Sequence, residues 1–221
     1  MAKTCSSHTR RGWVLSGLAL GLAACTTTPT APPVAQGVQR APDGSVTVFH
    51  RKSSGSLGAY DGQVEWTHRT GSWQGLPAVV MASPQFGTTL YEPASMGVWA
   101  NLAPNGTPVF SYQPAMAYPW PLSVGKTWTS HHTVTVHATG ATVPLRIDGR
   151  VESWGDVTVP AGTFKAYKVV LQMDNGDQDT YWFNPEPGLA ILKRQMVRSA
   201  RHPQGAGTLE AELLSVKRPG R

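Results

Sequence analysis

Charged residues are scarce in this chain of 221 residues: Lys, Arg, Asp and Glu make up 14% of it, against about 25% in an average soluble domain. Cysteine is nearly absent. Cys5 and Cys25 are the two cysteines, so the chain after residue 25 has no disulfide, thiolate metal ligand or cysteine nucleophile. These shortages exclude a disulfide-stapled miniprotein, and the chain has no series of long apolar runs that a polytopic membrane protein needs.

The N-terminus has the three parts of a secretory signal peptide. Residues 1–11 are basic and free of acid, residues 12–22 (GWVLSGLALGL) are apolar, and Leu22-Ala23-Ala24-Cys25 follows. The apolar part is too short to span a bilayer comfortably. An ordinary signal peptide with a chance cysteine is the alternative interpretation. The pair Arg10-Arg11 leaves open whether export is general secretory or twin-arginine.

Leu22-Ala23-Ala24-Cys25 resembles the lipobox of bacterial lipoproteins. The resemblance implies that residues 1–24 are removed and that Cys25 is the lipidation site, carrying acyl chains such as palmitate. Two or more acyl chains anchor a protein durably. Thr26 stands where such lipoproteins carry Asp when they stay at the inner membrane. The resemblance therefore implies a lipid anchor in the cell outer membrane, with the domain facing the periplasm.

Three segments follow from this interpretation: the signal peptide (1–24), a lipidated cysteine with a flexible tether (25–40), and one β-rich periplasmic domain (41–221). The tether is predicted because residues 26–36 (TTTPTAPPVAQ) are rich in Thr and Pro and favour extended polyproline geometry.

Alternation of apolar and polar residues predicts strands through the rest of the chain. No window of 11 or more residues there shows a helical apolar pattern free of Gly and Pro. Asn105-Gly106 and Asn175-Gly176 indicate hairpins with type I′ turns. The predicted fold is all-β, an antiparallel sandwich or part-open barrel of about ten strands. The candidate strands are residues 45–50, 64–69, 96–102, 109–112, 127–136, 143–152, 163–173, 179–184, 189–198 and 208–217.

Residues 118–198 resemble a family of exported all-β bacterial proteins and lipoproteins of unknown function. The resemblance depends on three blocks, YPWPLSVGKTW (118–128), VTVPAGTFKAYKV (157–169) and TYWFNPEPGL (180–189). It implies a twisted antiparallel sheet, with a part-open barrel as one form of it. The family has no catalytic residue that can be transferred to this chain.

A search for chemistry assigns no catalytic, cofactor-binding or metal-ligating residue. His131 and His132 face opposite sides of a strand, and His137 lies too far along it to share a metal with His131. The acidic run from Asp174 to Asp179 is predicted to be a solvated hairpin tip. The basic residues Lys193, Arg194, Arg198 and Arg201 are predicted to form a solvated strand face, and neither they nor an exported location favours a nucleic-acid partner. Seven tryptophans follow the signal peptide, which favours an aromatic core over an aromatic-lined cavity.

The sequence therefore predicts an envelope lipoprotein with a non-catalytic β domain for binding or envelope assembly, with no cofactor. Its expected partners are the membrane, reached through Cys25, and either envelope proteins or an amphiphilic ligand. A carrier of lipid or another amphiphile in an aromatic-lined barrel is the first alternative. A hydrolase of cell wall or glycans is the second.

Overall fold

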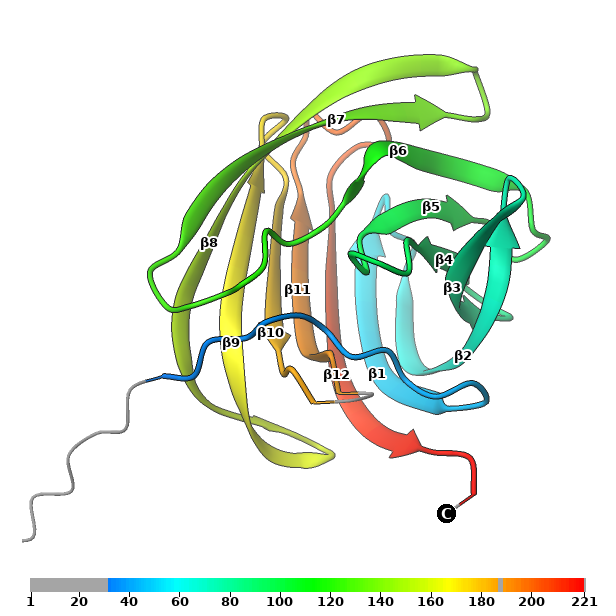
Figure 1. Cartoon of the computed structure of the whole chain (residues 1–221). Helices are drawn as coiled ribbons and strands as arrows, with labels where there is room; N and C mark the ends of the chain where they lie inside the picture. The colour runs from blue at the N-terminus through cyan, green and yellow to red at the C-terminus, as the bar shows by residue number, and fades with distance from the viewer. Residues whose placement is uncertain (1–31, 187–188, 221) are drawn as a thin grey trace, which may run out of the picture. The chain divides into compact units, whose positions relative to one another are not determined.

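The computed structural model describes residues 32–186 and 189–220. In these ranges the backbone forms twelve strands (Figure 1). The same residues contain no helix with the length and apolar character needed to cross a membrane. The strands are β1 (Val46–Gly55), β2 (Tyr60–Trp73), β3 (Leu76–Ser83), β4 (Gly87–Tyr91), β5 (Val98–Leu102), β6 (Pro108–Met116), β7 (Thr127–Val136), β8 (Ala141–Val159), β9 (Gly162–Met173), β10 (Gln178–Phe183), β11 (Ile191–Arg198) and β12 (Gly207–Lys217).

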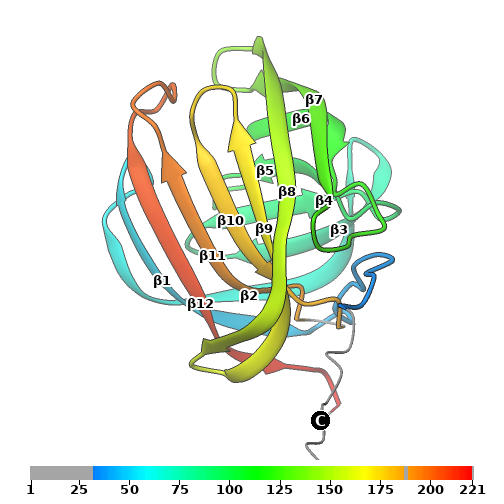
Figure 2. The ribbon, with the colours of Figure 1, turned by 90° about the vertical axis from the view of Figure 1, so that its left-hand side faces the viewer.

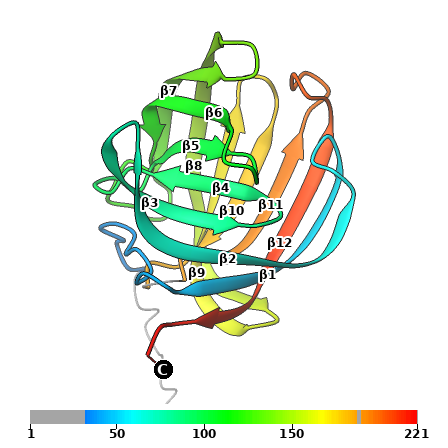
Figure 3. The ribbon, with the colours of Figure 1, turned by 90° about the vertical axis from the view of Figure 1, so that its right-hand side faces the viewer.

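All strands belong to one antiparallel sheet that closes on itself as a barrel. Each strand pairs with the next along the chain, and β1 closes the barrel by pairing with both β2 and β12. Figure 2 shows β8 to β12 side by side as one wall, and Figure 3 shows β1 to β5 as the wall opposite. The predicted all-β antiparallel class is confirmed; the strands number twelve among the described residues, and their sheet is closed.

Ten of the strands coincide with segments that the alternating pattern predicts, and β3 and β4 were missed. In β3, Ala78, Val79 and Val80 are all buried. Because both faces of this strand are covered, its sequence shows an apolar run instead of alternation. Strand β4 has five residues, too few for a periodic signal.

The two Asn-Gly pairs do form hairpin turns, but not of type I′. Gly106 and Gly176 have positive φ values of 83° and 87°, whereas neither Asn105 nor Asn175 does. Each Asn side chain instead accepts a hydrogen bond from the backbone N–H two residues on, at 3.0 Å in both turns. Such side-chain caps stabilise turns in which only the glycine needs left-handed geometry.

Apolar residues cover both faces of β9. On one face Tyr167 and Val169 pack with Leu122 from the β6–β7 connection and with Ala35. On the other face the end of the β8–β9 hairpin bends over β11 and β12. There Val157, Val159 and Ala166 pack with Leu192 and Leu213. Burying each Val or Leu side chain of these two clusters contributes about 1.5–3 kcal/mol to the stability of this wall.

An N-terminal strap, residues 33–39, lies across the lower end of this wall in Figure 1. Ala35 and Leu122 exchange two backbone hydrogen bonds of 2.9 and 2.8 Å, and the Tyr167 hydroxyl donates to the Pro33 carbonyl. Ala35 is 4% exposed. Residues 33–39, which the sequence assigns to the tether, therefore pack on the barrel, and the folded part begins before residue 41. The predicted signal peptide (1–24) and residues 25–31 lie outside the described residues.

Candidate functional site

The interior face of the barrel is the candidate site. Val169, Tyr181, Arg194, Ala211 and Arg51 are successive cross-strand partners from β9 to β1, so their side chains share one face of the sheet. Val169 belongs to the buried cluster under the strap, which identifies this face as the inner one. The alternate residues on the same strands face outward and include the exposed Lys52 and Glu210.

An ion pair occupies the middle of this interior face. Asp179 of β10 accepts two hydrogen bonds from Arg194 of β11, from Nε to Oδ1 at 3.0 Å and from Nη2 to Oδ2 at 2.7 Å. The Tyr181 hydroxyl donates to the same carboxylate at 2.7 Å. The Asp179 side chain is 3% exposed, whereas the Arg194 side chain keeps 33% of its surface accessible. The carboxylate is thus fully engaged, whereas the Arg194 side chain keeps accessible surface.

Three buried tyrosines, from β4, β6 and the β6–β7 connection, interact electrostatically with Arg194. Burial raises the pKa of Tyr91 on β4 to about 12, and Arg194 partly offsets this. Burial likewise raises the pKa of Tyr112 on β6 to about 12. Tyr118, which precedes β7, has a raised pKa for the same reason, with Asp179 adding to it. These phenols stay protonated at neutral pH, so each remains a hydrogen-bond donor.

The charge of Arg194 is secured by its partner. Burial by itself would lower the pKa of this guanidinium, but Asp179 and Tyr181 outweigh burial and hold the pKa above its ordinary value. Its guanidinium carbon also lies 5.1 Å from the centre of the Tyr181 ring. Arg194 is therefore a fixed cation, oriented by a carboxylate on one side and an aromatic ring beneath it.

Two further arginines belong to this face, Arg51 and Arg198. Burial lowers the pKa of Arg51 to about 10, and repulsion from Arg194 and Arg198 adds to the effect. The Arg51 guanidinium lies 4.2 Å from the ring centre of Phe86 and donates to the Leu57 carbonyl at 3.3 Å. Among the described residues no carboxylate lies within 4.0 Å of either Arg51 or Arg198 nitrogens.

The other end of the interior face is aromatic. Tyr118 contacts Trp120 and Trp128 edge to face, with ring centres 5.8 and 6.1 Å apart. Its ring centre also lies 6.1 Å from that of Phe183. These rings pack against Leu122 and the strap, so one end of the interior is apolar while the middle carries charge. Of the seven tryptophans that the sequence assigns to an aromatic core, Trp120 and Trp128 pack at this end and are partly buried.

The structure corrects two predictions about charged residues. The acidic run is not a solvated hairpin tip, because Asp177 is 3% and Asp179 2% exposed. The basic cluster is not one solvated face, because Lys193 points outward to Glu212 at 2.6 Å while Arg194 points inward. Sequence reasoning therefore missed Arg51, Asp179 and Arg194. Their only signal in the sequence is that each lies on one alternating face of its strand. This does not identify a site until it is known which face points into the barrel.

The histidines lie as the sequence predicts. His131 is exposed and His132 is 7% exposed, on opposite faces of β7. His132 contacts the Pro114 carbonyl at 2.9 Å and the Ser130 hydroxyl at 3.0 Å, so both ring nitrogens are engaged. Within residues 32–186 and 189–220 no three His, Cys, Asp or Glu side chains come together as a metal site. Cys25, the predicted lipidation site, lies outside those residues.

A serine, a histidine and an aspartate meet near the β11–β12 connection, but they are not arranged for nucleophilic catalysis. His202 Nε2 lies 3.7 Å from Asp177 Oδ2. The Ser199 hydroxyl donates to the Asn175 carbonyl at 2.6 Å instead of to the imidazole. A nucleophile needs a hydrogen bond to its base, and the Ser199 hydroxyl donates elsewhere. The group instead links the β9–β10 connection to the β11–β12 connection.

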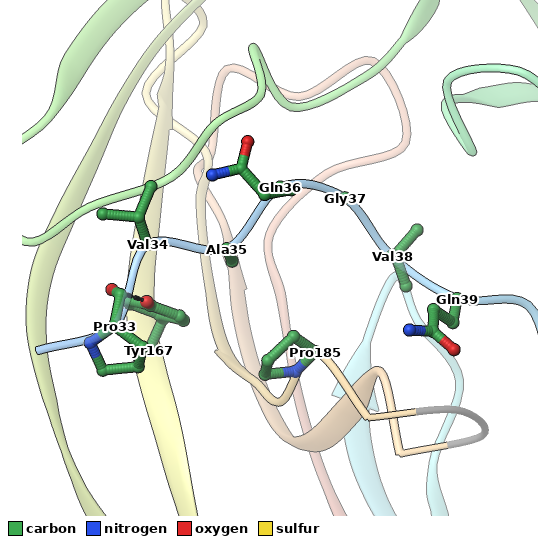
Figure 4. Close-up of a pocket in the computed structure, with 9 residues that line it drawn as sticks. All are labelled: Pro33, Val34, Ala35, Gln36, Gly37, Val38, Gln39, Tyr167 and Pro185. Atoms are coloured by element: carbon green, nitrogen blue, oxygen red, sulfur yellow. Dashed lines mark hydrogen bonds between the residues drawn. The ribbon is translucent and has the colours of Figure 1, made fainter.

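A hollow lies beneath the strap (Figure 4). It is open, has a volume of about 410 Å³, and is bordered by strap residues together with Tyr167 and Pro185. Its lining has no carboxylate, imidazole or cationic side chain. It therefore offers packing surface without the groups that chemistry or charge recognition would need.

Comparison with protein-family models finds no match, and comparison with curated proteins finds none. Three solved structures are similar. A Bacteroides fragilis protein, described as exported with a YmcC-like fold, has 12% identity, 83% coverage of this chain, 100% of its own and a TM-score of 0.45. The hypothetical lipoprotein YmcC from Escherichia coli has 7% identity, coverages of 77% and 83%, and a TM-score of 0.41. A protein described as a lipoprotein from Parabacteroides distasonis has 9% identity, coverages of 83% and 99%, and a TM-score of 0.37.

Proposed function

We propose that this chain is a lipid-anchored envelope protein whose barrel binds a ligand on its interior face without catalysing a reaction. The observation that carries the proposal is the composition of that face. A barrel stabilised only for folding would fill its interior with aliphatic side chains at crystal-like density. Here Arg51, Arg194 and Tyr181 project inward, and all three keep part of their surface accessible.

The anchor belongs to the same proposal. Cys25 carries the acyl chains, holds the protein at the outer membrane, and leaves the barrel in the periplasm. Seven residues separate Cys25 from Pro33, where the strap begins to pack. The eight Cα–Cα steps from Cys25 to Pro33 span at most about 29 Å. The strap end of the barrel would therefore stay close to the membrane, and the end with the β1–β2 and β11–β12 connections would face away.

A carrier of an amphiphile is the second candidate, and the aromatic end of the interior supports it. Tyr118, Trp120, Trp128 and Phe183 lie next to the charged middle of the same face. An amphiphile could place its apolar tail against these rings and its polar group near Arg194. The two candidates differ in whether the bound molecule has an apolar tail.

Native mass spectrometry of the full exported chain, purified from envelopes in a neutral detergent, tests both candidates. Solvent extraction then identifies whatever co-purifies. A211W is the test variant, because Ala211 lies on the interior face between Arg194 and Arg51 and is partly exposed. The matched control is Q195W, whose side chain lies on the outward face of β11.

We expect a bound mass on the wild type and on Q195W, and its loss from A211W. A lipid would favour the carrier, and a tail-free molecule would favour the simpler binding role. A wild-type chain with no bound mass, before and after incubation with an envelope extract, would contradict the proposal.

A further inference from the structure

We propose that Arg51, Arg194 and Arg198 together form an anion-binding site on the interior face, which takes a ligand bearing carboxylate, phosphate or sulfate groups. This inference rests on the proposed function, because it names the chemistry of the ligand that the barrel would hold.

The three arginines face the same space. Arg194 pairs with Ala211, and Ala211 pairs with Arg51, so the two arginines stand two strands apart on one rung of the barrel. Strands are about 4.8 Å apart, which puts these two Cα atoms about 10 Å from each other. Arg198 follows Arg194 by four residues on β11, and therefore has the same parity. Guanidinium groups on side chains of this length can converge on one ligand.

Positive charge exceeds negative charge at this position. Asp179 is saturated by Arg194 and Tyr181, as described above. Asp177 is the other acid near Arg198, and it is engaged by the Ser199 backbone N–H at 2.7 Å and the Asn175 side chain at 3.0 Å. His202 beside it and the protonated Tyr91, Tyr112 and Tyr118 add no negative charge at neutral pH. Arg51 has no acidic neighbour of its own among the described residues.

Unused donors remain on all three guanidinium groups. Arg198 Nε is buried and has no hydrogen-bond partner among the described residues. Arg51 donates through Nε and Nη2, and Arg194 through the same two atoms, which leaves Nη1 of each without a partner in the described part of the chain. Buried donors are nearly always paired in native proteins, so the buried Nε of Arg198 is an exception. This N–H and the two accessible Nη1 groups, beside surplus positive charge, are donors that an oxyanion would accept from.

The outer face of the same strands shows that the chain pairs its charges elsewhere. Lys193 lies 2.6 Å from Glu212, and Lys168 lies 2.7 Å from Glu152. The excess on the inner face is therefore local and does not reflect a general lack of acids. The rings of Phe86 and Tyr181 beneath two of the guanidiniums hold them in place without neutralising them.

Arg198 also indicates how a ligand reaches the site. It donates to the Ser56 carbonyl and to the Gln204 side chain, which belong to the β1–β2 and β11–β12 connections. The strap and the β6–β7 connection cover the opposite end of the barrel (Figure 1). An acidic ligand would therefore approach through the end that carries Arg198.

Binding of defined acidic probes to the full lipidated chain in neutral detergent tests the inference. The probes are inorganic phosphate, trigalacturonate and dihexanoyl phosphatidylglycerol, with maltotriose as a neutral control, measured by calorimetry at constant ionic strength. These arms distinguish a free anion, an acidic glycan and a lipid headgroup. The variants are R51Q, R198Q and R51Q/R198Q, and R69Q is the matched control because Arg69 is exposed on β2.

We expect at least one acidic probe to bind the wild type and R69Q alike, and to bind R51Q/R198Q at least about 10-fold more weakly, as the loss of charge-assisted hydrogen bonds implies. R51K/R198K keeps both charges without the planar fork. It should lose less affinity than the Gln variant, and its near-UV circular dichroism reports whether the barrel is folded.

Two results would overturn the inference: no acidic probe binds the wild type, or R51Q/R198Q binds as well as R69Q. If a neutral ligand co-purifies with R51Q/R198Q as it does with the wild type, the inference of an anion site is wrong but the proposed function still holds. If no mass co-purifies and no probe binds, both the anion site and the proposed function are contradicted.

Discussion

Replacing Asp179 with Asn would test whether the interior ion pair is buried and whether Arg194 depends on Asp179 for its charge compensation. The substitution keeps the size of the side chain and removes its charge. Arg194 would then lose the carboxylate that accepts both of its hydrogen bonds, and Tyr181 would face an amide. The cation would stay in the barrel, where Arg51 and Arg198 already repel it.

The expected loss of stability in D179N depends on how well the uncompensated charge of Arg194 is solvated. Breaking one partner of a buried ion pair costs about 3–5 kcal/mol, because the other charge is left uncompensated. Arg194 keeps 33% of its side-chain surface accessible, so water can partly solvate it. We therefore expect the lower end of that range, about 3 kcal/mol. For a domain of this size that corresponds to a melting temperature lower by roughly 6–12 °C.

Urea unfolding followed by tryptophan fluorescence measures this loss as a lower midpoint with an unchanged slope. D156N is the matched control. Asp156 pairs with Lys165 at 3.0 Å on the outside, with both side chains more than half exposed. Such a surface pair contributes less than about 1 kcal/mol. Equal midpoints for D179N and D156N would refute the reasoning.

A double-mutant cycle separates the ion pair from other effects of the substitution. R194M removes the cation and leaves Asp179 with the Tyr181 hydroxyl. If the cost of D179N comes from the uncompensated guanidinium, D179N/R194M should be more stable than D179N alone. A double variant that loses the sum of the two single effects would show that the pair is not coupled.

Three further outcomes are expected. Tyr91 and Tyr112 have pKa values raised to about 12, so the stability that their neutral forms contribute is complete below pH 10 and is lost as the pH rises towards 12. Absorbance at 295 nm, which reports ionised tyrosine, should therefore rise together with unfolding. Ionisation of all tyrosines of the folded chain with a midpoint near pH 10 would contradict this. G149A should cost about 1–3 kcal/mol in urea unfolding, because a Cβ there would lie 2.2 Å from the Trp128 ring, whereas G155A meets nothing within 4 Å and serves as control. C25S should shift the chain from the membrane to the soluble fraction and remove the acyl mass, and an unchanged distribution would contradict lipidation.

Much of the fold could be predicted from the sequence, because half-buried strands alternate in composition. The segment from Thr127 to Val136 was predicted with the bounds that the structure has, since Trp128, Val134 and Val136 share one parity. Strand β3 could not be found in this way. Its consecutive buried residues carry no period of two, and a run of that kind is not distinguishable from other buried segments.

The candidate site could not be predicted, because it depends on which face of each strand points inward. Along β11 one parity holds Leu192, Arg194, Met196 and Arg198, and the other holds Ile191, Lys193, Gln195 and Val197. Each set mixes apolar with polar residues, so neither identifies itself as the inner one. The choice is made by pairing with β10 and β12, because Arg194 pairs with Tyr181 on one side and with Ala211 on the other. A slip of one residue in these pairings would turn the other set inward.

Asp179 shows why local motifs mislead here. It follows an Asn-Gly turn in a run of acids, a pattern typical of a solvated hairpin tip. The turn itself is a hairpin as predicted, yet Asp179 is the second residue of β10 and faces inward. Its burial is tolerated because Arg194, the cross-strand partner of Tyr181, lies diagonally from it on β11 and forms the ion pair. Two charges that are unremarkable in the sequence become a buried pair only through long-range register.

The distribution of charge between the two faces connects stability with function. On the outer face, pairs such as Lys193 with Glu212 contribute little, because water already solvates both partners. On the inner face each guanidinium is costly, and Arg51 has no counter-ion among the described residues. A chain selected for stability alone would place an apolar residue at that position, since such replacements of buried charges are commonly neutral or stabilising. The presence of Arg51 beside Arg194 and Arg198 is therefore better explained by binding than by folding, and R51M should raise the melting temperature of the ligand-free chain while it weakens the binding of acidic probes.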